Sequence, residues 1–344
     1  MNRKHRKQFA QILAGGMAWT GITSSLLARR RRRADFRIFI LDYHEVEQGP
    51  IEREGVVSAD RFRRHIHFLK QRFDIVSLAE AVDRLAAGPP LDRDSVVITL
   101  DDGYIGNYEH AFGALRDEGV PATVFVATAF VDGEPLWTDL GRRAIKRARA
   151  MALPDSLDAE LEVLARGWKR GADPIEALKT VAPPARDELI RRLIAATGRP
   201  DNIARAMSWR QISEMAAAGI EIGCHTVNHP ILPTLSATEQ LDEIDQSRSR
   251  IAEMTGIEPT VFAYPNGDYD ENSIDALRGL GFAAACTTRC GSNTPGCDPY
   301  QLSRIGIGAD SNHLVAARLT GIFDQQYREQ MVDLGPVRSQ AADA

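Results

Sequence analysis

Residues 96–102 read Val-Val-Ile-Thr-Leu-Asp-Asp, a run of strand-forming residues that ends in two adjacent acids. Similar apolar runs recur along the chain. They lie at 36–43, 122–126, 220–224, 261–264 and 283–287, with a weaker one at 302–307. Strands that are apolar along their whole length are typical of a parallel sheet buried on both faces. The sequence therefore predicts an α/β fold.

Helical patterns fill the spaces between these runs, and several of them end at a glycine that can cap a helix. The expected helices cover 59–73, 78–87, 108–118, 209–218, 236–255 and 272–280. About seven strand–helix repeats suit a distorted (β/α) barrel of parallel strands. In such a barrel the loops that follow the strands meet at one rim, where functional side chains gather.

The chain divides into a basic segment at 1–35, a large domain at 36–322 and a polar tail at 323–344. No strand pattern appears between Trp137 and Met207. Charged, Ala-rich stretches interrupted by prolines, at Pro154, Pro174, Pro183, Pro184 and Pro200, occupy this part of the chain. We predict a helical insertion at about 139–207 that forms a lid or a flank.

The net charge of −5 conceals an asymmetry, because residues 1–37 carry ten Lys and Arg and one acid. The rest of the chain is therefore at about −14. An acidic body argues against nucleic acid as a partner.

The basic segment has an uncharged stretch, Phe9–Ala28, between the basic cluster at 3–7 and five arginines at 29–33. Only 12 of these 20 residues are apolar, which is weak for a transmembrane helix. We predict that residues 1–33 form a basic helix on an anionic membrane surface, at the cytoplasmic face, or that the chain is cytoplasmic. The alternatives are a signal or anchor that exports the chain, and a disordered basic arm.

Two strand ends carry groups suited to catalysis. Asp101 and Asp102 follow the strand at 96–100, although an Asp-Asp-Gly turn with solvated acids is a common alternative. His225 and His229 follow the strand at 220–224, four residues apart. A lone histidine is more often structural, but two histidines with a carboxylate leave coordination positions open for water and substrate. The set predicts a catalytic metal site.

At these residues the chain resembles a known family. Thr99–Tyr104 (TLDDGY) is similar to the T-F-D-D-G motif, and His225–His229 (HTVNH) to the H-[ST]-x-x-H motif, of the polysaccharide deacetylases. This is carbohydrate esterase family 4, the NodB homology domain. Phe262–Gly267 (FAYPNG) stands where the family has R-x-P-x-G, and Leu41–His44 (LDYH) resembles the "YH" strand of one branch. The resemblance covers roughly 36–308.

The resemblance implies a distorted barrel and metal-dependent removal of acetyl groups from sugars. The metal would be zinc, with cobalt, nickel or manganese as alternatives. Carried over by motif, Asp102, His225 and His229 would bind the metal, Asp101 would be the general base, the Asn266 backbone N–H would stabilise the oxyanion, and Tyr104, Tyr264 and Pro265 would contact substrate.

Two departures from the family stand out. Ala263 replaces the arginine that orients the base, and the run at 302–307 lacks the histidine that acts as general acid. His313 and His44 are the candidates for this acid, and either could instead be a structural histidine. Because an amine leaving group needs a proton, a missing acid would slow N-deacetylation more than O-deacetylation.

We therefore predict a metal-dependent hydrolase that removes N- or O-acetyl groups from a carbohydrate, acting on a surface or lipid-linked polysaccharide. One alternative is a catalytically weak or inactive sugar-binding relative. The other is a hydrolase of non-peptide C–N bonds on the same fold.

Overall fold

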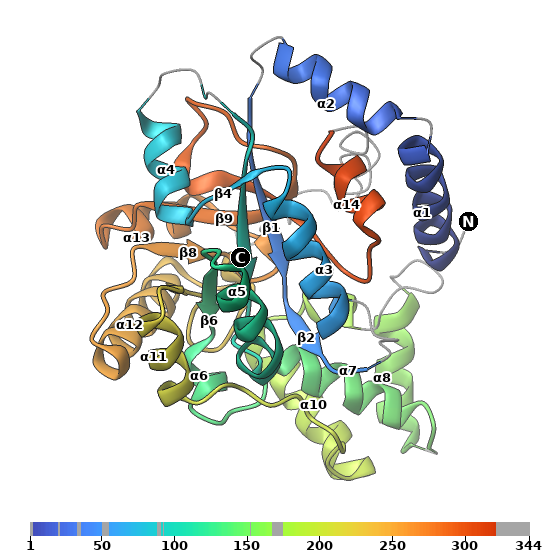
Figure 1. Cartoon of the computed structure of the whole chain (residues 1–344). Helices are drawn as coiled ribbons and strands as arrows, with labels where there is room; N and C mark the ends of the chain where they lie inside the picture. Colours follow the sequence, from blue (N-terminus) through green and yellow to red (C-terminus); the bar gives the residue numbers. More distant parts are fainter. Residues whose placement is uncertain are drawn as a thin grey trace.

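Seven parallel strands close into a barrel, as the sequence predicts (Figure 1). The computed structural model describes residues 3–19, 21–32, 36–49, 55–87, 91, 93–151, 153–166 and 175–320. The barrel strands are β1 (Ile38–Tyr43), β5 (Ser95–Leu100), β6 (Thr123–Val126), β7 (Glu221–Cys224), β8 (Val261–Ala263), β9 (Ala284–Cys290) and β10 (Leu302–Gly306). Their order is β1-β10-β9-β8-β7-β6-β5, and β1 pairs with β5 along its whole length to close the ring.

Three short strands were not predicted from the sequence. β4 (Asp74–Ile75) extends the sheet beside β5, and β2 (Glu45–Glu47) pairs with β3 (Val56–Ser58) in a separate parallel ribbon. Their lengths of two and three residues are too short to produce a recognisable pattern.

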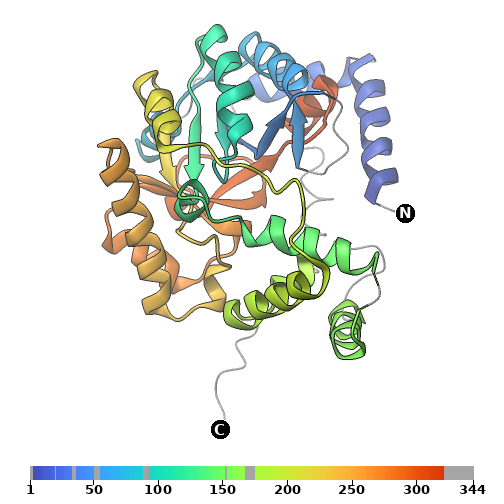
Figure 2. The same ribbon diagram turned by 90° about the horizontal axis from the view of Figure 1, so that it is seen from below.

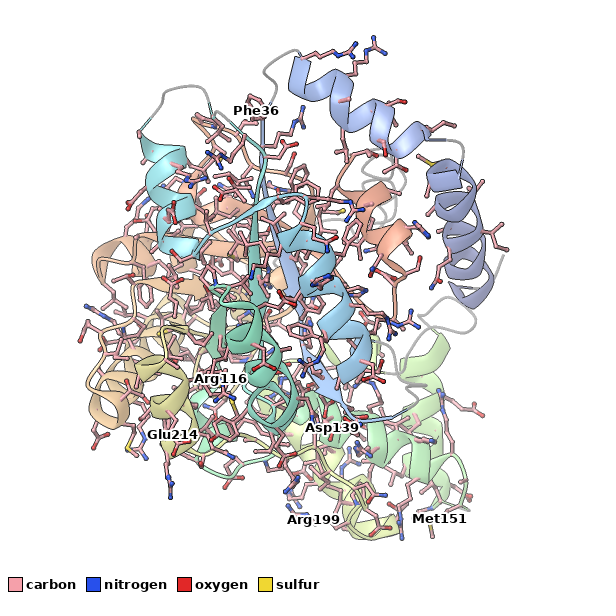
Figure 3. All side chains as sticks on the ribbon, in the orientation of Figure 1. Phe36, Arg116, Asp139, Met151, Arg199 and Glu214 are labelled. Atoms are coloured by element: carbon pink, nitrogen blue, oxygen red, sulfur yellow. The ribbon has the colours of Figure 1, made fainter. Side chains whose placement is uncertain are left out.

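Most residues of the barrel strands are apolar because successive residues enter two different cores. In β1, Phe39 and Leu41 belong to the larger core, whereas Ile38 and Ile40 belong to the smaller one. All four side chains are at most 1% exposed. Side chains fill both the interior of the barrel and the space between the strands and the helices (Figure 3).

Six helices around the barrel match the predicted ones. They are α3 (Ala59–Lys70), α4 (Leu78–Ala86), α5 (Gly113–Glu118), α11 (Trp209–Ala217), α12 (Ala237–Thr255) and α13 (Glu271–Gly279). Two further helices, α6 (Thr128–Val131) and α14 (Asn312–Arg318), were not predicted. Gly119 and Gly256 take left-handed caps with φ of 62° and 72°. One detail differs, because the helix expected at 108–118 begins as a π-helical segment, Asn107–Phe112.

The insertion is helical and packs around a small core of its own. It contains α7 (Trp137–Ala148), α8 (Asp155–Arg166), α9 (Ile175–Leu178) and α10 (Pro183–Thr197). This group projects from one side of the barrel (Figure 2). Its core includes Ile231, which comes just after His229. The predicted break at Pro174 lies outside the described residues.

The N-terminal segment forms two helices, α1 (Arg3–Trp19) and α2 (Ile22–Arg32), where a single helix or a disordered arm was expected. Gly21, with φ of 72°, donates its N–H to the Ala18 carbonyl in the turn between them. Within the described residues, no helix combines the length and apolar character needed to cross a bilayer. The tail predicted at 323–344 lies outside the described residues.

Candidate active site

The three predicted metal ligands converge at the carboxyl ends of β5 and β7. Asp102 follows β5, and His225 and His229 follow β7. The Asp102 Oδ1 atom lies 3.4 Å from His225 Nε2 and 3.3 Å from His229 Nε2. All three residues are buried, and their potential ligand atoms lie within 4.8 Å of one another.

This cluster fits a divalent cation. Asp102 Oδ1 is buried and has no hydrogen-bond partner among the residues that the structure describes. A buried acceptor without a partner is costly, and a cation bound between the three side chains would remove that cost. One carboxylate and two imidazoles form a donor set that suits zinc and similar metals, with positions left open.

A hydrogen bond to the backbone fixes the orientation of the His225 ring. His225 Nδ1 lies 2.6 Å from the Ala263 carbonyl oxygen, to which it donates its proton. The lone pair of Nε2 is therefore free on the side of Asp102. Position 263 thus contributes to the site through its main chain.

The His225–His229 loop is strained and held from several directions. Thr226 and His229 have positive φ angles of 66° and 52°. The Thr226 hydroxyl accepts the His229 N–H at 3.0 Å. Such conformations persist where surrounding contacts enforce them.

Two residues that were not singled out from the sequence supply side-chain contacts to this loop. The Glu243 carboxylate, on α12, accepts the N–H groups of Val227 and Asn228, both at 2.9 Å. The Trp137 indole, at the start of the insertion, donates to the His229 carbonyl at 2.7 Å. The insertion is therefore attached directly to the second histidine.

Asp101 lies beside the cluster, and Arg304 on β10 holds it. The guanidinium makes a bidentate contact, with its two nitrogens 2.8 Å and 2.7 Å from the Asp101 oxygens. Burial alone would raise the pKa of Asp101, but the charge and hydrogen bonds of Arg304 together with the charges of His225 and His44 outweigh it, and the pKa is lowered. Arg304 thus supplies from β10 the positive charge that Ala263 lacks on β8.

His44, at the end of β1, is the candidate acid that the structure brings to the site. Its Nδ1 lies 3.4 Å from Asp42 Oδ1, and Arg304 lies 3.5 Å from the same oxygen. Burial lowers the pKa of His44, but the nearby carboxylates, Asp42 foremost, raise it above its usual value. Asp42, His44 and Asp101 form a second group of potential ligand atoms, but the Arg304 guanidinium already pairs with Asp101 and lies 3.5 Å from Asp42.

The other predicted site residues differ in their exposure and in their distance from the metal cluster. His313 is exposed on α14 and lines a separate cavity beneath α2. Tyr264 is 0% exposed, and its hydroxyl donates to the Tyr300 carbonyl, so its ring packs in the core. Its contact with substrate stays a prediction. Pro265 is likewise buried and begins the turn that presents Asn266. Tyr104 is partly buried against Phe130 just after Asp102.

Asn266 occupies an exposed turn after β8, with a left-handed φ of 60°. Its side-chain oxygen accepts from Lys179 of the insertion at 2.6 Å, and its amide donates to Asp268 at 2.6 Å. Its carbonyl accepts from the Thr288 hydroxyl at 2.9 Å. The turn is therefore fixed from both sides, and the insertion contacts the candidate oxyanion donor as well as His229.

Comparisons with known proteins identify the family to which the chain is similar. The family model "Polysaccharide deacetylase" matches residues 88–285. YxkH of Bacillus subtilis (strain 168), named for the polysaccharide deacetylases, is 22% identical over 269 residues, which are 78% of this chain and 70% of that protein.

The solved structures that resemble this one share its fold. The deacetylase PplD of Streptococcus pyogenes, in complex with acetate, has a TM-score of 0.57 at 19% identity, covering 82% of this chain and 97% of that one. IcaB of Ammonifex degensii has a TM-score of 0.56 at 23% identity, covering 83% and 97%.

Proposed function

The chain belongs to the polysaccharide deacetylase family, and from that premise we propose that it is a metal-dependent hydrolase that removes acetyl groups from a carbohydrate. The observation that carries the proposal is the convergence of Asp102 Oδ1 with the two histidine Nε2 atoms. The Asp101 carboxylate adjoins this cluster and is held ionised by Arg304.

Asp102, His225 and His229 would hold the metal, which we propose to be zinc, with cobalt, nickel or manganese as alternatives. When bound, a divalent ion supplies Lewis acidity, which lowers the pKa of water and polarises an acetyl carbonyl. The Ala263 carbonyl keeps the His225 tautomer that exposes Nε2. Glu243 and Trp137 hold the histidine loop in its strained conformation.

In the proposed reaction, the Asp101 carboxylate takes a proton from the attacking water. Arg304 keeps this carboxylate charged and fixes its direction through two hydrogen bonds. The backbone N–H of Asn266 donates to the oxyanion that forms on the acetyl carbon. Attack forms the new C–O bond of a tetrahedral intermediate, and collapse of this intermediate breaks the acetyl C–N or ester C–O bond and releases acetate.

His44 is the proposed general acid, because it is the histidine of the two candidates that adjoins Asp101. The neighbouring carboxylates raise the pKa of His44 and favour the protonated form that an acid requires. The imidazolium would give its proton to the departing amine or hydroxyl of the sugar. With this acid in place, the site can act on N-acetyl as well as O-acetyl groups.

The proposed substrate is an acetylated oligosaccharide or polysaccharide, on a cell surface or linked to a lipid. We place the encounter at the cytoplasmic face of an anionic membrane, reached through residues 1–33, because bases outnumber acids there. Export through an N-terminal signal or anchor is the alternative location. The acidic body gives no reason to expect nucleic acid as a partner.

Two other functions predict different results. A sugar-binding relative without activity would bind saccharides and release no acetate. Its support in the sequence was the absence of a base-orienting arginine and of an acid, for which Arg304 and His44 now offer replacements. A hydrolase of other C–N bonds would release product from cyclic amides and leave acetylated sugars intact.

The test is acetate release by the zinc- or cobalt-loaded chain on a panel of N- and O-acetylated oligosaccharides. Asp101→Asn is the matched control, because it preserves the shape of the side chain and removes its basicity. Release by the native chain and a loss of roughly a hundredfold or more in the variant would support the proposal. Saccharide binding with no release from any member of the panel would refute it.

A further inference from the structure

The N-terminal helices are fixed to the barrel, so their outer face has a defined direction. On α1, Ala10 and Ala14 pack against Leu314 and Ala317 of α14. Gln11 donates to the Ala309 carbonyl at 3.1 Å. Leu27 of α2 packs against the main core. The two helices therefore lie against α14 at one side of the molecule (Figure 1).

The face of these helices that turns away from the barrel carries exposed apolar side chains. Ile12 is 72% exposed, Leu13 42% and Ile22 45%. Exposed Arg29 and Arg32 follow at the end of α2. Exposed apolar side chains with bases at a helix end are typical of helices that bind the surface of an anionic bilayer.

A cavity of about 770 Å³ lies behind this face, between α2, α3 and α14. Its basic lining includes Arg64, Arg72 and His313, and its apolar lining includes Leu27 and Phe68. This combination suits the phosphate of an amphiphile whose chains remain in an apolar layer.

The charges around the cavity are only partly neutralised from within the protein. Arg63 pairs with Asp117 at 3.0 Å, and His67 contacts Glu118 at 3.0 Å. The guanidinium of Arg64 has no ion-pair or hydrogen-bond partner in the described part of the chain. Arg64 is therefore the group best placed to receive an external anion.

We propose that α1, α2 and this cavity form a docking site for an anionic phospholipid bilayer, with Ile12, Leu13 and Ile22 entering the membrane surface and Arg64 receiving a lipid phosphate. The proposal deepens the membrane contact proposed above, and no part of it requires deacetylase activity. Because α2 lies near the start of β1 and the catalytic groups lie at the strand ends, docking leaves the catalytic rim open (Figure 1).

The test is co-sedimentation of the full chain with vesicles of phosphatidylcholine alone or mixed equally with phosphatidylglycerol. We expect binding to the mixed vesicles that weakens at high salt. Arg64→Ala should lower the association constant about fivefold. The double variant Ile12→Ser/Leu13→Ser should lower it about tenfold or more.

The controls remove similar groups elsewhere on the surface. Leu241→Ser/Met254→Ser changes two exposed apolar residues of α12, and Arg210→Ala removes one exposed charge from α11. Both should bind vesicles as the native chain does. Acetate release from a soluble oligosaccharide should be unchanged in Arg64→Ala, so that a failure of docking is distinguished from a failure of catalysis.

Equal binding to both kinds of vesicle, or equal losses in the test and control variants, would overturn the proposal. A third outcome would also overturn it. If the chain binds inorganic phosphate through Arg64 but does not bind vesicles, the cavity is a site for a free anion.

Discussion

The substitution Arg304→Met tests whether Arg304 stabilises the buried carboxylates of this site. Arg304 is 1% exposed and lies between two buried carboxylates, 2.7 Å from Asp101 and 3.5 Å from Asp42. Methionine fills much of the same space but leaves Asp101 without its paired guanidinium and removes one of the two positive groups beside Asp42. Removing one partner of a buried ion pair typically costs about 3–5 kcal/mol of folding free energy.

That cost can be converted into a melting temperature. The unfolding entropy near the transition is about 2.1 cal/mol/K per residue, or about 0.7 kcal/mol/K for this chain. The expected decrease in Tm is therefore about 4–7 °C, measured by calorimetry at neutral pH. Arg289→Met is the matched control, because the guanidinium of Arg289 on β9 donates to the Ser303 hydroxyl and the Gln301 carbonyl and pairs with no carboxylate among the described residues.

The same substitution should change the pH dependence. Because the pKa of Asp101 is lower in the native state, its ionisation stabilises the fold above the unfolded-state pKa of about 3.9. This contribution is lost as the pH falls from there through the folded-state pKa. Without Arg304 the pKa of Asp101 rises, so the variant should lack this acid-sensitive contribution. The acidic limb of the acetate-release profile should also move to higher pH.

Three outcomes would show that the reasoning about Arg304 is wrong. They are an unchanged Tm in Arg304→Met, an equal decrease in Arg289→Met, and an acidic limb that stays in place. The double variant Arg304→Met/Asp101→Asn checks the cause, because removing one buried charge should recover part of the lost stability.

Other side chains of the site give further predictions. His44→Gln should lower acetate release about a hundredfold or more on N-acetyl substrates and less on O-acetyl esters, and it should abolish the decline in rate as the pH rises through the raised pKa of His44. Glu243→Gln should weaken metal binding about tenfold, measured by isothermal titration, whereas Glu239→Gln on the same helix should leave it unchanged. Trp137→Phe leaves the His229 carbonyl without its donor and should cost about 1–3 kcal/mol of stability, measured by denaturant unfolding.

The parts of the fold that the sequence predicted are those encoded by neighbouring residues. The barrel strands were recognisable because each is a continuous apolar run, and the runs correspond to β1 and β5–β10 within a few residues. The motifs at Thr99–Tyr104 and His225–His229 were recognisable because their spacing is local. The separate ribbon of β2 and β3 was missed because three residues carry no periodicity.

The parts of the site that were missed depend on contacts between distant residues. Arg304 is 203 positions from Asp101 in the chain, and only the closure of the barrel brings the two together. Its one available signal was a charged residue within an apolar strand. The sequence offered no reason to prefer His44 over His313 as the acid. The fold distinguishes them, because His44 follows β1 beside Asp101 whereas His313 lies on α14 at another cavity. Glu243 and Trp137 resemble ordinary helix residues until their partners are known.

The most direct test of the central claim is a metal titration of the stripped full chain, with bound metal and acetate release followed in the same samples. We predict that activity rises in proportion to bound zinc or cobalt and reaches its plateau at about one equivalent, since one open cluster holds the ion. Asp102→Ala should lose metal and activity together. Full acetate release by the stripped chain, or by Asp102→Ala without bound metal, would contradict the assignment of Asp102, His225 and His229 as the metal site of a deacetylase.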